Sequence, residues 1–213
     1  MGMRTGKLFL PFLIISLISC QKEVDLQPGP GSGTGSGGGG NTTSIIGDYD
    51  FVGMVAHTQS TVAVSDQAQQ LKAVTVADYV TKNNVGTAKF TSSDFIGTGI
   101  GYSIDTMMNV KTYIDNVLFD DSDFPYVVTS PPANSTSPYV RVTADSITIT
   151  GAFGASTGPS GSTPNGPIGV KLSWSGDTLL LKISSTFTQN ITQNGVPGVL
   201  TGTVIGVTKL KKR

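Results

Sequence analysis

The stretch VKLSWSGDTLLLKISSTF, residues 170–187, gives the strongest indication of the fold. Val170, Leu172 and Trp174 alternate with polar residues, and the apolar residues at 179, 181, 183 and 187 keep that spacing after a Ser-Gly-Asp loop. Residues two apart lie on the same face of a β-strand, so each run predicts a strand with one apolar face. Two such runs joined by a short glycine-containing loop predict an antiparallel hairpin.

The same spacing recurs on the N-terminal side of this hairpin, where Tyr49, Phe51, Gly53 and Val55 share a face. Further candidate strands, rich in β-branched residues, span 71–80, 87–91, 96–105, 108–114, 117–119, 126–129, 139–143, 146–150 and 199–210. Turn signals separate them at 82–84, 92–94, 115–116, 144–145 and 194–195. Residues 66–72 are compatible with a helical turn, and 131–138 and 151–169 are expected to be long loops. This organisation predicts an all-β fold, an antiparallel up-and-down β-barrel, with a β-sandwich as the alternative.

Charge is scarce and balanced in this chain. It has 213 residues, with 14 basic and 14 acidic side chains, one His and one Cys, and 49 residues are Ser or Thr. A nucleic-acid binder needs a basic face, so the composition argues against that class. One Cys excludes an internal disulfide, and one His and one Cys exclude a zinc site built from several of either. We therefore expect no nucleic-acid partner, no metal and no cofactor.

The first 20 residues have the organisation of a secretory signal. Arg4 and Lys7 precede an apolar run at 8–18, which is soon followed by Cys20. The run is shorter than the roughly 20 apolar residues that a membrane-spanning helix needs. We therefore expect residues 1–19 to be a signal peptide.

The sequence Leu17-Ile18-Ser19-Cys20 resembles the lipobox of bacterial lipoproteins. The resemblance implies that Cys20 is diacylated on sulfur, that the chain is cut before it, and that the new amine is acylated. Such acyl chains anchor a protein to a membrane that it does not span. The residues KEVD at 22–25 look like the surface-export signal of Bacteroidetes lipoproteins, with a plain polar tether as the alternative. The expected location is the cell envelope, at the periplasmic or exposed side of the outer membrane.

A glycine-rich segment separates this leader from the rest of the chain. Residues 28–40 read PGPGSGTGSGGGG and behave as a flexible coil, so Cys20 and Ser44 are roughly 25–30 Å apart on average. We therefore expect a signal peptide at 1–19, a lipidated Cys20 with its tether up to 44, and one β-barrel domain at 45–213. At about 165 residues, that domain is large enough for a substantial core.

The sequence GDYDF at 47–51 opens the first expected strand and is similar to the Gly-x-Trp motif of lipocalins. The Thr-containing segment 202–210 is similar in character to the last strand of small lipocalin-like bacterial lipoproteins. The resemblance implies an eight-stranded up-and-down barrel in which Tyr49 closes one end. A basic residue packs on that aromatic side chain in lipocalins, and Lys209 and Lys211 are both candidates for it.

Several other polar clusters are interpreted as structural. The single histidine, His57, is expected to be a polar strand residue. Asp120, Asp121 and Asp123 lie in one expected loop but lack the spacing of a calcium-binding loop, which favours a solvated turn. The glycines at 97–101 are followed by no helical signal, and helix N-termini are what bind phosphate, so these glycines are expected in a twisted strand.

Three sequences, at 105–107, 145–147 and 177–179, read Asp, hydroxyl residue, aliphatic residue. They look like the acceptor motif for O-glycosylation of exported Bacteroidetes proteins, with Thr106, Ser146 and Thr178 as acceptors. The structural alternative has equal support: Asp with Ser or Thr closes a turn, and the aliphatic residue begins a strand. The Asn-x-Ser/Thr sequences that begin at 41, 134 and 190 are expected to be incidental.

Three functions suit a lipid-anchored β domain. The first is non-catalytic binding of a small hydrophobic ligand, with Tyr49, Phe51 and Trp174 as the candidate interior residues. The alternative is a structural or accessory surface protein with a filled barrel, acting through protein or glycan contacts. An enzyme has the least support, because only scattered Asp residues and His57 bear on it, and no catalytic residue is assigned.

Overall fold

The computed structural model describes residues 44–66, 69–150, 167–193 and 195–213. The chain divides into two units, Met1–Gly37 and Gly38–Arg213, and every described residue belongs to the second. Cys20, the expected signal peptide and nearly all of the expected tether therefore lie outside the described residues, as does most of the expected loop at 151–169.

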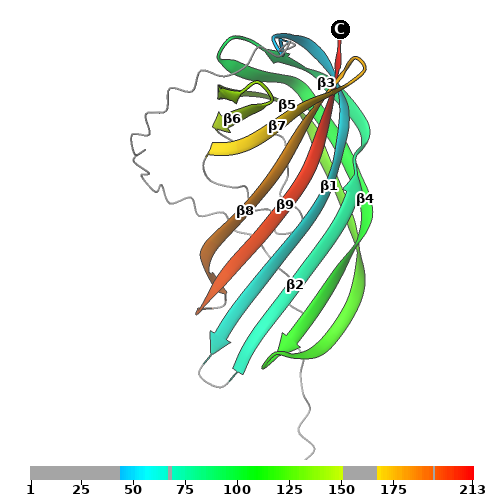
Figure 1. The fold of residues 1–213 in the computed structure, drawn as a ribbon. Helices are drawn as coiled ribbons and strands as arrows, with labels where there is room; N and C mark the ends of the chain where they lie inside the picture. Colours follow the sequence, from blue (N-terminus) through cyan, green and yellow to red (C-terminus); the bar gives the residue numbers. More distant parts are fainter. Residues whose placement is uncertain (1–43, 67–68, 151–166, 194) are drawn as a thin grey trace, which may run out of the picture. The chain divides into compact units, whose positions relative to one another are not determined.

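Nine β-strands and no helix make up the described residues, which confirms the all-β prediction (Figure 1). The strands are β1 (Gly47–Asp66), β2 (Gln69–Val80), β3 (Lys82–Phe90), β4 (Asp94–Ile114), β5 (Val117–Thr143), β6 (Ser146–Thr150), β7 (Pro167–Ser175), β8 (Thr178–Gln193) and β9 (Val196–Lys212). The part of the chain that is described holds no helix long and apolar enough to span a membrane.

The expected hairpin at 170–187 is present. Strands β7 and β8 pair antiparallel from Ser175 with Thr178 to Val170 with Ile183. The turn between them contains Gly176 at φ +61°, a left-handed conformation that glycine adopts without steric cost. The loop chemistry that predicted the hairpin therefore also explains its turn.

The strands form one antiparallel sheet in which, except for β2 and β3, neighbours in the chain are neighbours in the sheet. Strand β1 also pairs with β9, from Tyr49 with Lys212 to Val64 with Gly198, so the sheet closes into a ring. Strands β2 and β3 both lie between β1 and β4 and run in the same direction, so together they occupy one of eight places in the ring. The described strands thus form a single sheet rather than the two packed sheets of a sandwich.

The expected turn at 82–84 is wrong, because this segment begins β3 and the strand direction does not reverse. The backbone N–H of Thr81 donates to the carbonyl of Met54 at 2.9 Å, and the N–H of Met54 donates to Thr81 Oγ1 at 2.8 Å. Asn84 Nδ2 donates to a carbonyl of β1 at 2.9 Å. A Cβ on Gly53 would come within 2.6 Å of that Nδ2, so glycine makes room for it. The polar signal at 82–84 marks an irregularity within the ladder instead of a turn.

Two other loop or helix predictions are also wrong. Residues 131–138 belong to β5 and pair with β4, as Asp94 does with Pro138. Residues 117–138 pair only with β4 among the described strands, and proline is tolerated in a strand with one free edge. The expected helical turn at 66–72 is replaced by the end of β1 and the start of β2.

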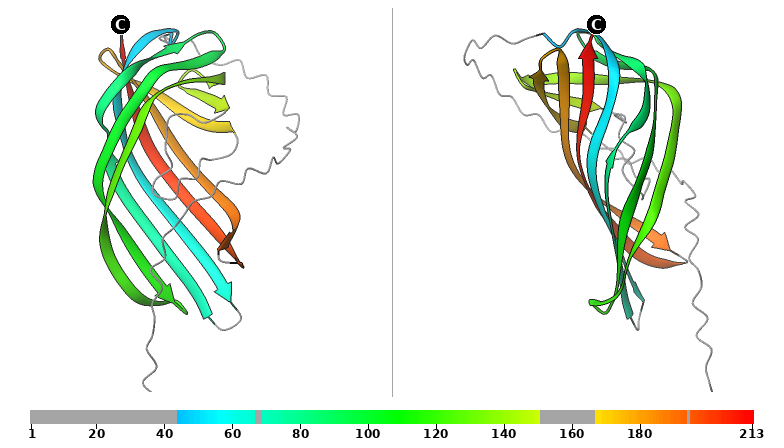
Figure 2. Two further views of the ribbon diagram at one scale, coloured as in Figure 1. Left: turned by 180° about the vertical axis from the view of Figure 1, so that it is seen from behind. Right: turned by 90° about the vertical axis from the view of Figure 1, so that its right-hand side faces the viewer.

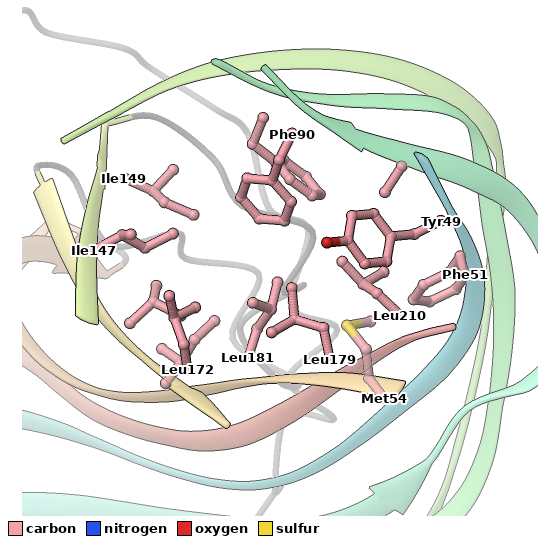
Figure 3. Packing of buried hydrophobic residues seen from close by; sticks show 14 of the residues in the cluster. Tyr49, Phe51, Met54, Phe90, Ile147, Ile149, Leu172, Leu179, Leu181 and Leu210 are labelled. Carbon is pink, nitrogen blue, oxygen red and sulfur yellow. The ribbon is translucent and has the colours of Figure 1, made fainter. Parts of the chain in front are cut away.

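The core lies where β3, β6 and β7 join the ring, and we name this part the closed end. Its side chains share one face of the sheet, which we name the inward face; the other is the outward face. Figure 3 shows buried side chains of this cluster pointing toward one another, among them Tyr49, Phe51, Met54, Phe90, Ile147, Ile149, Leu172, Leu179, Leu181 and Leu210. Their removal from water is the main force that holds the ring together.

Six strands continue beyond the short strands β6 and β7 (Figures 1 and 2). We name these continuations the extension: residues 58–64 of β1, 71–77 of β2, 106–114 of β4, 117–128 of β5, 185–193 of β8 and 196–204 of β9. Within the extension, β5 pairs only with β4 and β8 pairs only with β9, among the described residues. The inward face of the extension consists of the side chains on the same side of the sheet as the core.

Candidate functional site

The three candidate interior residues lie at the closed end. Tyr49 is completely buried, and its hydroxyl donates to the carbonyl of Ile45 at 2.6 Å. The ring of Tyr49 lies edge-on to Phe90 with centroids 6.0 Å apart, and its centroid is 6.4 Å from that of Trp174. Phe51 is buried and Trp174 is half-buried against the same cluster. Protein side chains, packed against one another, fill this end of the ring.

Burial also controls the ionisation of phenols at this end. It raises the pKa of Tyr49 to about 12, with the neighbouring Tyr139 acting in the same direction. Burial raises the pKa of Tyr79 as well. Low polarity disfavours the phenolate, so both groups stay neutral across the physiological range.

The two lysines proposed to pack on Tyr49 lie elsewhere. Lys211 Nζ is 3.7 Å from Asp177 Oδ2 in an exposed ion pair. Lys209 is the register partner of Leu180, on the outward face. The ring of Tyr49 instead contacts the aromatic rings of Phe90 and Trp174.

Beyond the core, the inward face remains apolar. Val62 has Ala73 of β2 and Leu200 of β9 as register partners, and Met108 has Ala77 and Phe124. The apolar side chains of this face in the extension are Val62, Val64, Leu71, Ala73, Ala77, Met108, Val110, Ile114, Val117, Phe124, Val128, Phe187, Ile191, Val196, Leu200 and Val204. Most of them are only half-buried, so apolar surface remains in contact with solvent.

Phe187 and Gly202 form a specific pair on this face. They are register partners across β8 and β9, and a Cβ on Gly202 would lie 2.2 Å from Cε1 of Phe187. The absence of a side chain on Gly202 therefore lets the phenyl ring lie across β9. Sequence reasoning missed this pair, although Phe187 carried the period-two signal.

Charge is nearly absent from the inward face of the extension. Asp120 is its one charged residue among those described, and Ser122 Oγ donates to that carboxylate at 2.9 Å. The other polar side chains on this face are Thr58, Ser60, Thr75, Thr106, Thr112, Ser122, Tyr126, Ser185, Gln189 and Gln193. Hydroxyl and amide groups therefore provide almost all of its polarity.

The outward face carries the charged residues that the inward face lacks. His57 Nδ1 lies 2.8 Å from Asp78 Oδ1, and the two are register partners on β1 and β2. Exposed ion pairs also join Lys82 to Asp105 at 3.2 Å and Lys111 to Asp121 at 3.4 Å. His57 is thus a partly exposed strand residue, as the sequence predicts.

The acidic group at 120–123 is divided between the two faces because it lies in β5 and not in a loop. Asp120 belongs to the inward face, whereas Asp121 and Asp123 belong to the outward face. Asn109 Nδ2 donates to Asp121 Oδ1 at 2.8 Å and to Asp123 Oδ1 at 3.0 Å, and the bond from Asn109 is the main cause of a lowered pKa at Asp121. No cluster of residues suited to hold a metal ion occurs among the positions described.

The glycines at 97–101 lie in β4, in a strand as expected. Gly99 has φ +59°, and the facing Gly86 of β3 has φ +101°. A Cβ on Gly86 would come within 2.4 Å of the carbonyl oxygen of Gly99. These glycines therefore allow the close approach of two backbones where the β3–β4 ladder is irregular.

The three proposed O-glycan acceptors occupy two kinds of position. Ser146 and Thr178 are the first residues of β6 and β8, each directly after a turn, as the structural alternative expects. Thr106 lies within β4 instead, and its hydroxyl donates to the carbonyl of Asp78 at 2.8 Å. All three side chains are half-buried.

Comparison of the chain with protein-family models, with curated proteins and with solved structures gave no match. The chemistry of the site must therefore be read from its own residues. The inward face of the extension offers half-buried apolar surface, hydroxyl and amide groups, and one carboxylate. Such a surface is suited to non-covalent binding of an apolar molecule.

Proposed function

We propose that this protein is a membrane-anchored exported lipoprotein whose β-barrel domain binds a small hydrophobic ligand without catalysis. The observation that carries the proposal is the run of half-buried apolar side chains on the inward face of the extension, beyond the filled core. A ligand covering these side chains would gain about 0.8 kcal/mol for each methylene group removed from water.

The position of the ligand differs from the one expected from sequence. Tyr49 and Phe51 are already buried by protein side chains, so a ligand would lie beyond them, on the side of the core that faces the extension. The contacts would instead come from residues such as Met108, Val110 and Phe187. The lipocalin-like features are an eight-place meander and an aromatic residue at one end, and they support a binding module as an analogy of architecture.

A second function has one observation in its favour. The closed end is filled by its own side chains, which suits a structural or accessory surface protein with no interior ligand. Such a protein would act through its outward face and would bind a protein or a glycan there. The ligand test below separates the two functions, because only the first depends on the inward face.

The test uses two adjacent methionines on opposite faces of β4. Met108 is half-buried on the inward face, whereas Met107 is 53% exposed on the outward face. The full chain and the variants Met108→Asp and Met107→Asp are titrated with an uncharged solvatochromic dye, and circular dichroism verifies that each variant is folded.

The binding proposal predicts that Met108→Asp weakens dye binding about tenfold or more, because a carboxylate would face an apolar ligand. Met107→Asp is expected to bind like the unaltered chain. Equal binding by both variants, or no binding by the unaltered chain, would favour the structural function.

The anchor is tested separately at Cys20. In the native host, the full chain is expected in the membrane fraction, and Cys20→Ser is expected to remain soluble or unprocessed. The intact mass of the purified native protein gives the second readout. A mass equal to the acylated polypeptide from Cys20 to Arg213 would support lipidation and exclude glycans on Thr106, Ser146 and Thr178.

A further inference from the structure

The inward face of the extension lacks basic residues among those described, and this bears on which hydrophobic ligands it can bind. Its described residues include no Lys, Arg or His, and they include one acid, Asp120. The undescribed residues of the domain do not change this balance, because 67–68, 151–166 and 194 contain no charged residue in the sequence.

From these observations we infer that the site takes an uncharged long-chain amphiphile, such as a monoacylglycerol or a long-chain alcohol, in preference to a fatty-acid anion. This inference rests on the proposed function and specifies the class of its ligand. A carboxylate brought onto an apolar face loses its hydration, and it needs a cation or several hydrogen-bond donors in return. The inward face supplies no cation among its described residues, and Asp120 would repel an anion.

The basic residues of the extension lie on the other face of the sheet. Lys72 is the register partner of Ala63 and Tyr113, and Lys111 is bonded to Asp121; all of these are outward. Lys72 is held there by Tyr113, whose ring centroid lies 4.4 Å from the ammonium nitrogen. Two elements that form the inward face therefore turn their lysines away from it.

The remaining polar groups suit a neutral headgroup. Thr112 and Ser122 flank Asp120 on the inward face, and these hydroxyl and carboxylate groups can exchange hydrogen bonds with ligand hydroxyls. The inward face is also long enough for an extended chain, because the six steps from residue 58 to residue 64 of β1 rise about 20 Å along the strand. A long apolar face that also carries hydroxyl groups therefore matches an amphiphile with a long acyl or alkyl chain and an uncharged headgroup.

The test compares two ligands with the same acyl chain by isothermal titration of the full chain below their micellar concentrations. Monolauroylglycerol is expected to bind at least about tenfold more tightly than laurate at pH 8. The variant Met108→Lys places a cation on the inward face and is expected to reduce or reverse this preference. The matched outward variant Met107→Lys is expected to leave the preference unchanged.

Each result has a distinct meaning. Equal or tighter binding of laurate by the unaltered chain overturns the inference while leaving the proposed function in place. Preference for the neutral ligand that persists unchanged in Met108→Lys also overturns it, because the selection then does not arise on this face. Failure of both ligands and of the uncharged dye to bind refutes the proposed function itself.

Discussion

Removal of one hydroxyl group at the closed end should measurably destabilise the fold. Tyr49→Phe keeps the ring that packs on Phe90 and Trp174 but removes the donor to the Ile45 carbonyl. Because that acceptor belongs to a buried residue, the loss should cost about 1–2 kcal/mol. With a urea dependence of about 2 kcal/mol per M, the unfolding midpoint should fall by roughly 0.5–1 M.

The same substitution should also change the pH dependence of stability. The folded pKa of Tyr49, about 12, lies above the ordinary value of 10.0, so the folded state favours the neutral phenol. The resulting stabilisation is complete below pH 10 and is lost as pH rises from 10 to 12. Tyr49→Phe should therefore lose less stability over that interval than the unaltered chain, although Tyr79 still contributes a loss.

The assay is urea unfolding at pH 8 and at steps from pH 10 to 12, followed by Trp174 fluorescence and by circular dichroism. Tyr113→Phe is the matched control, because Tyr113 lies on the outward face and keeps its ring beside Lys72 in the variant. This control should change stability by less than about 0.5 kcal/mol. An equal urea midpoint for Tyr49→Phe and the control would refute the reasoning. So would a loss of stability between pH 10 and 12 in Tyr49→Phe that equals the loss in the unaltered chain.

Three further substitutions test other features of the fold by the same unfolding assay. Gly86→Ala should destabilise the fold by about 2 kcal/mol or more, because φ is +101° and the new Cβ would lie 2.4 Å from a backbone oxygen. The control Gly169→Ala, which has open space around the new Cβ, should change stability by less than about 1 kcal/mol. Equal effects of the two substitutions would contradict this prediction. Gly202→Ala should destabilise the fold by about 1–3 kcal/mol, because the new methyl group overlaps the Phe187 ring. In the double variant with Phe187→Ala that overlap is absent, so the combined loss of stability should be smaller than the sum of the two single losses. Additive losses would show that the two residues do not interact. Asp50→Asn should cost less than about 1 kcal/mol, since its ion pair with Arg213 at 2.6 Å is half-exposed, and the cost should shrink in high salt; a larger cost that salt leaves unaltered would be inconsistent with a surface pair.

Period-two patterning was sufficient to predict the strands with one fully buried face. The hairpin of β7 and β8 follows from such a pattern, because its inward residues Val170, Leu179 and Leu181 are at most 1% exposed. Strand β5 was predicted only as three separate segments, 117–119, 126–129 and 139–143, and not as one continuous strand. Its residues 117–138 pair along one edge only and have little burial on either face. Such residues need no alternation of apolar and polar side chains and can include proline, so their composition resembles that of a loop.

The site was predictable only in part. Tyr49 and Phe51 share a buried face of β1, but the expected face does not continue through Gly53 and Val55, because a bulge between Phe51 and Gly53 puts Val55 on the outward face. Sequence also could not show that neighbouring side chains fill the space around Tyr49 and Phe51. The inward face of the extension depends on register across six strands, and register is set by pairings between distant residues such as Val62 and Leu200. The separation of Asp120 from Asp121 and Asp123 likewise required knowledge that they lie in a strand.

Closure of the ring between β1 and β9 has a consequence for the order of events during synthesis. The pairing joins Val64 to Gly198 and Tyr49 to Lys212, and the backbone N–H of Arg213 donates to the carbonyl of Asp48. At roughly 5–20 residues per second, a ribosome needs of the order of 10 s to make the chain between such partners. During that interval the long edge of β1 has no β9 to pair with, so a nascent chain would be vulnerable to pairing with strands of other proteins until β9 emerges.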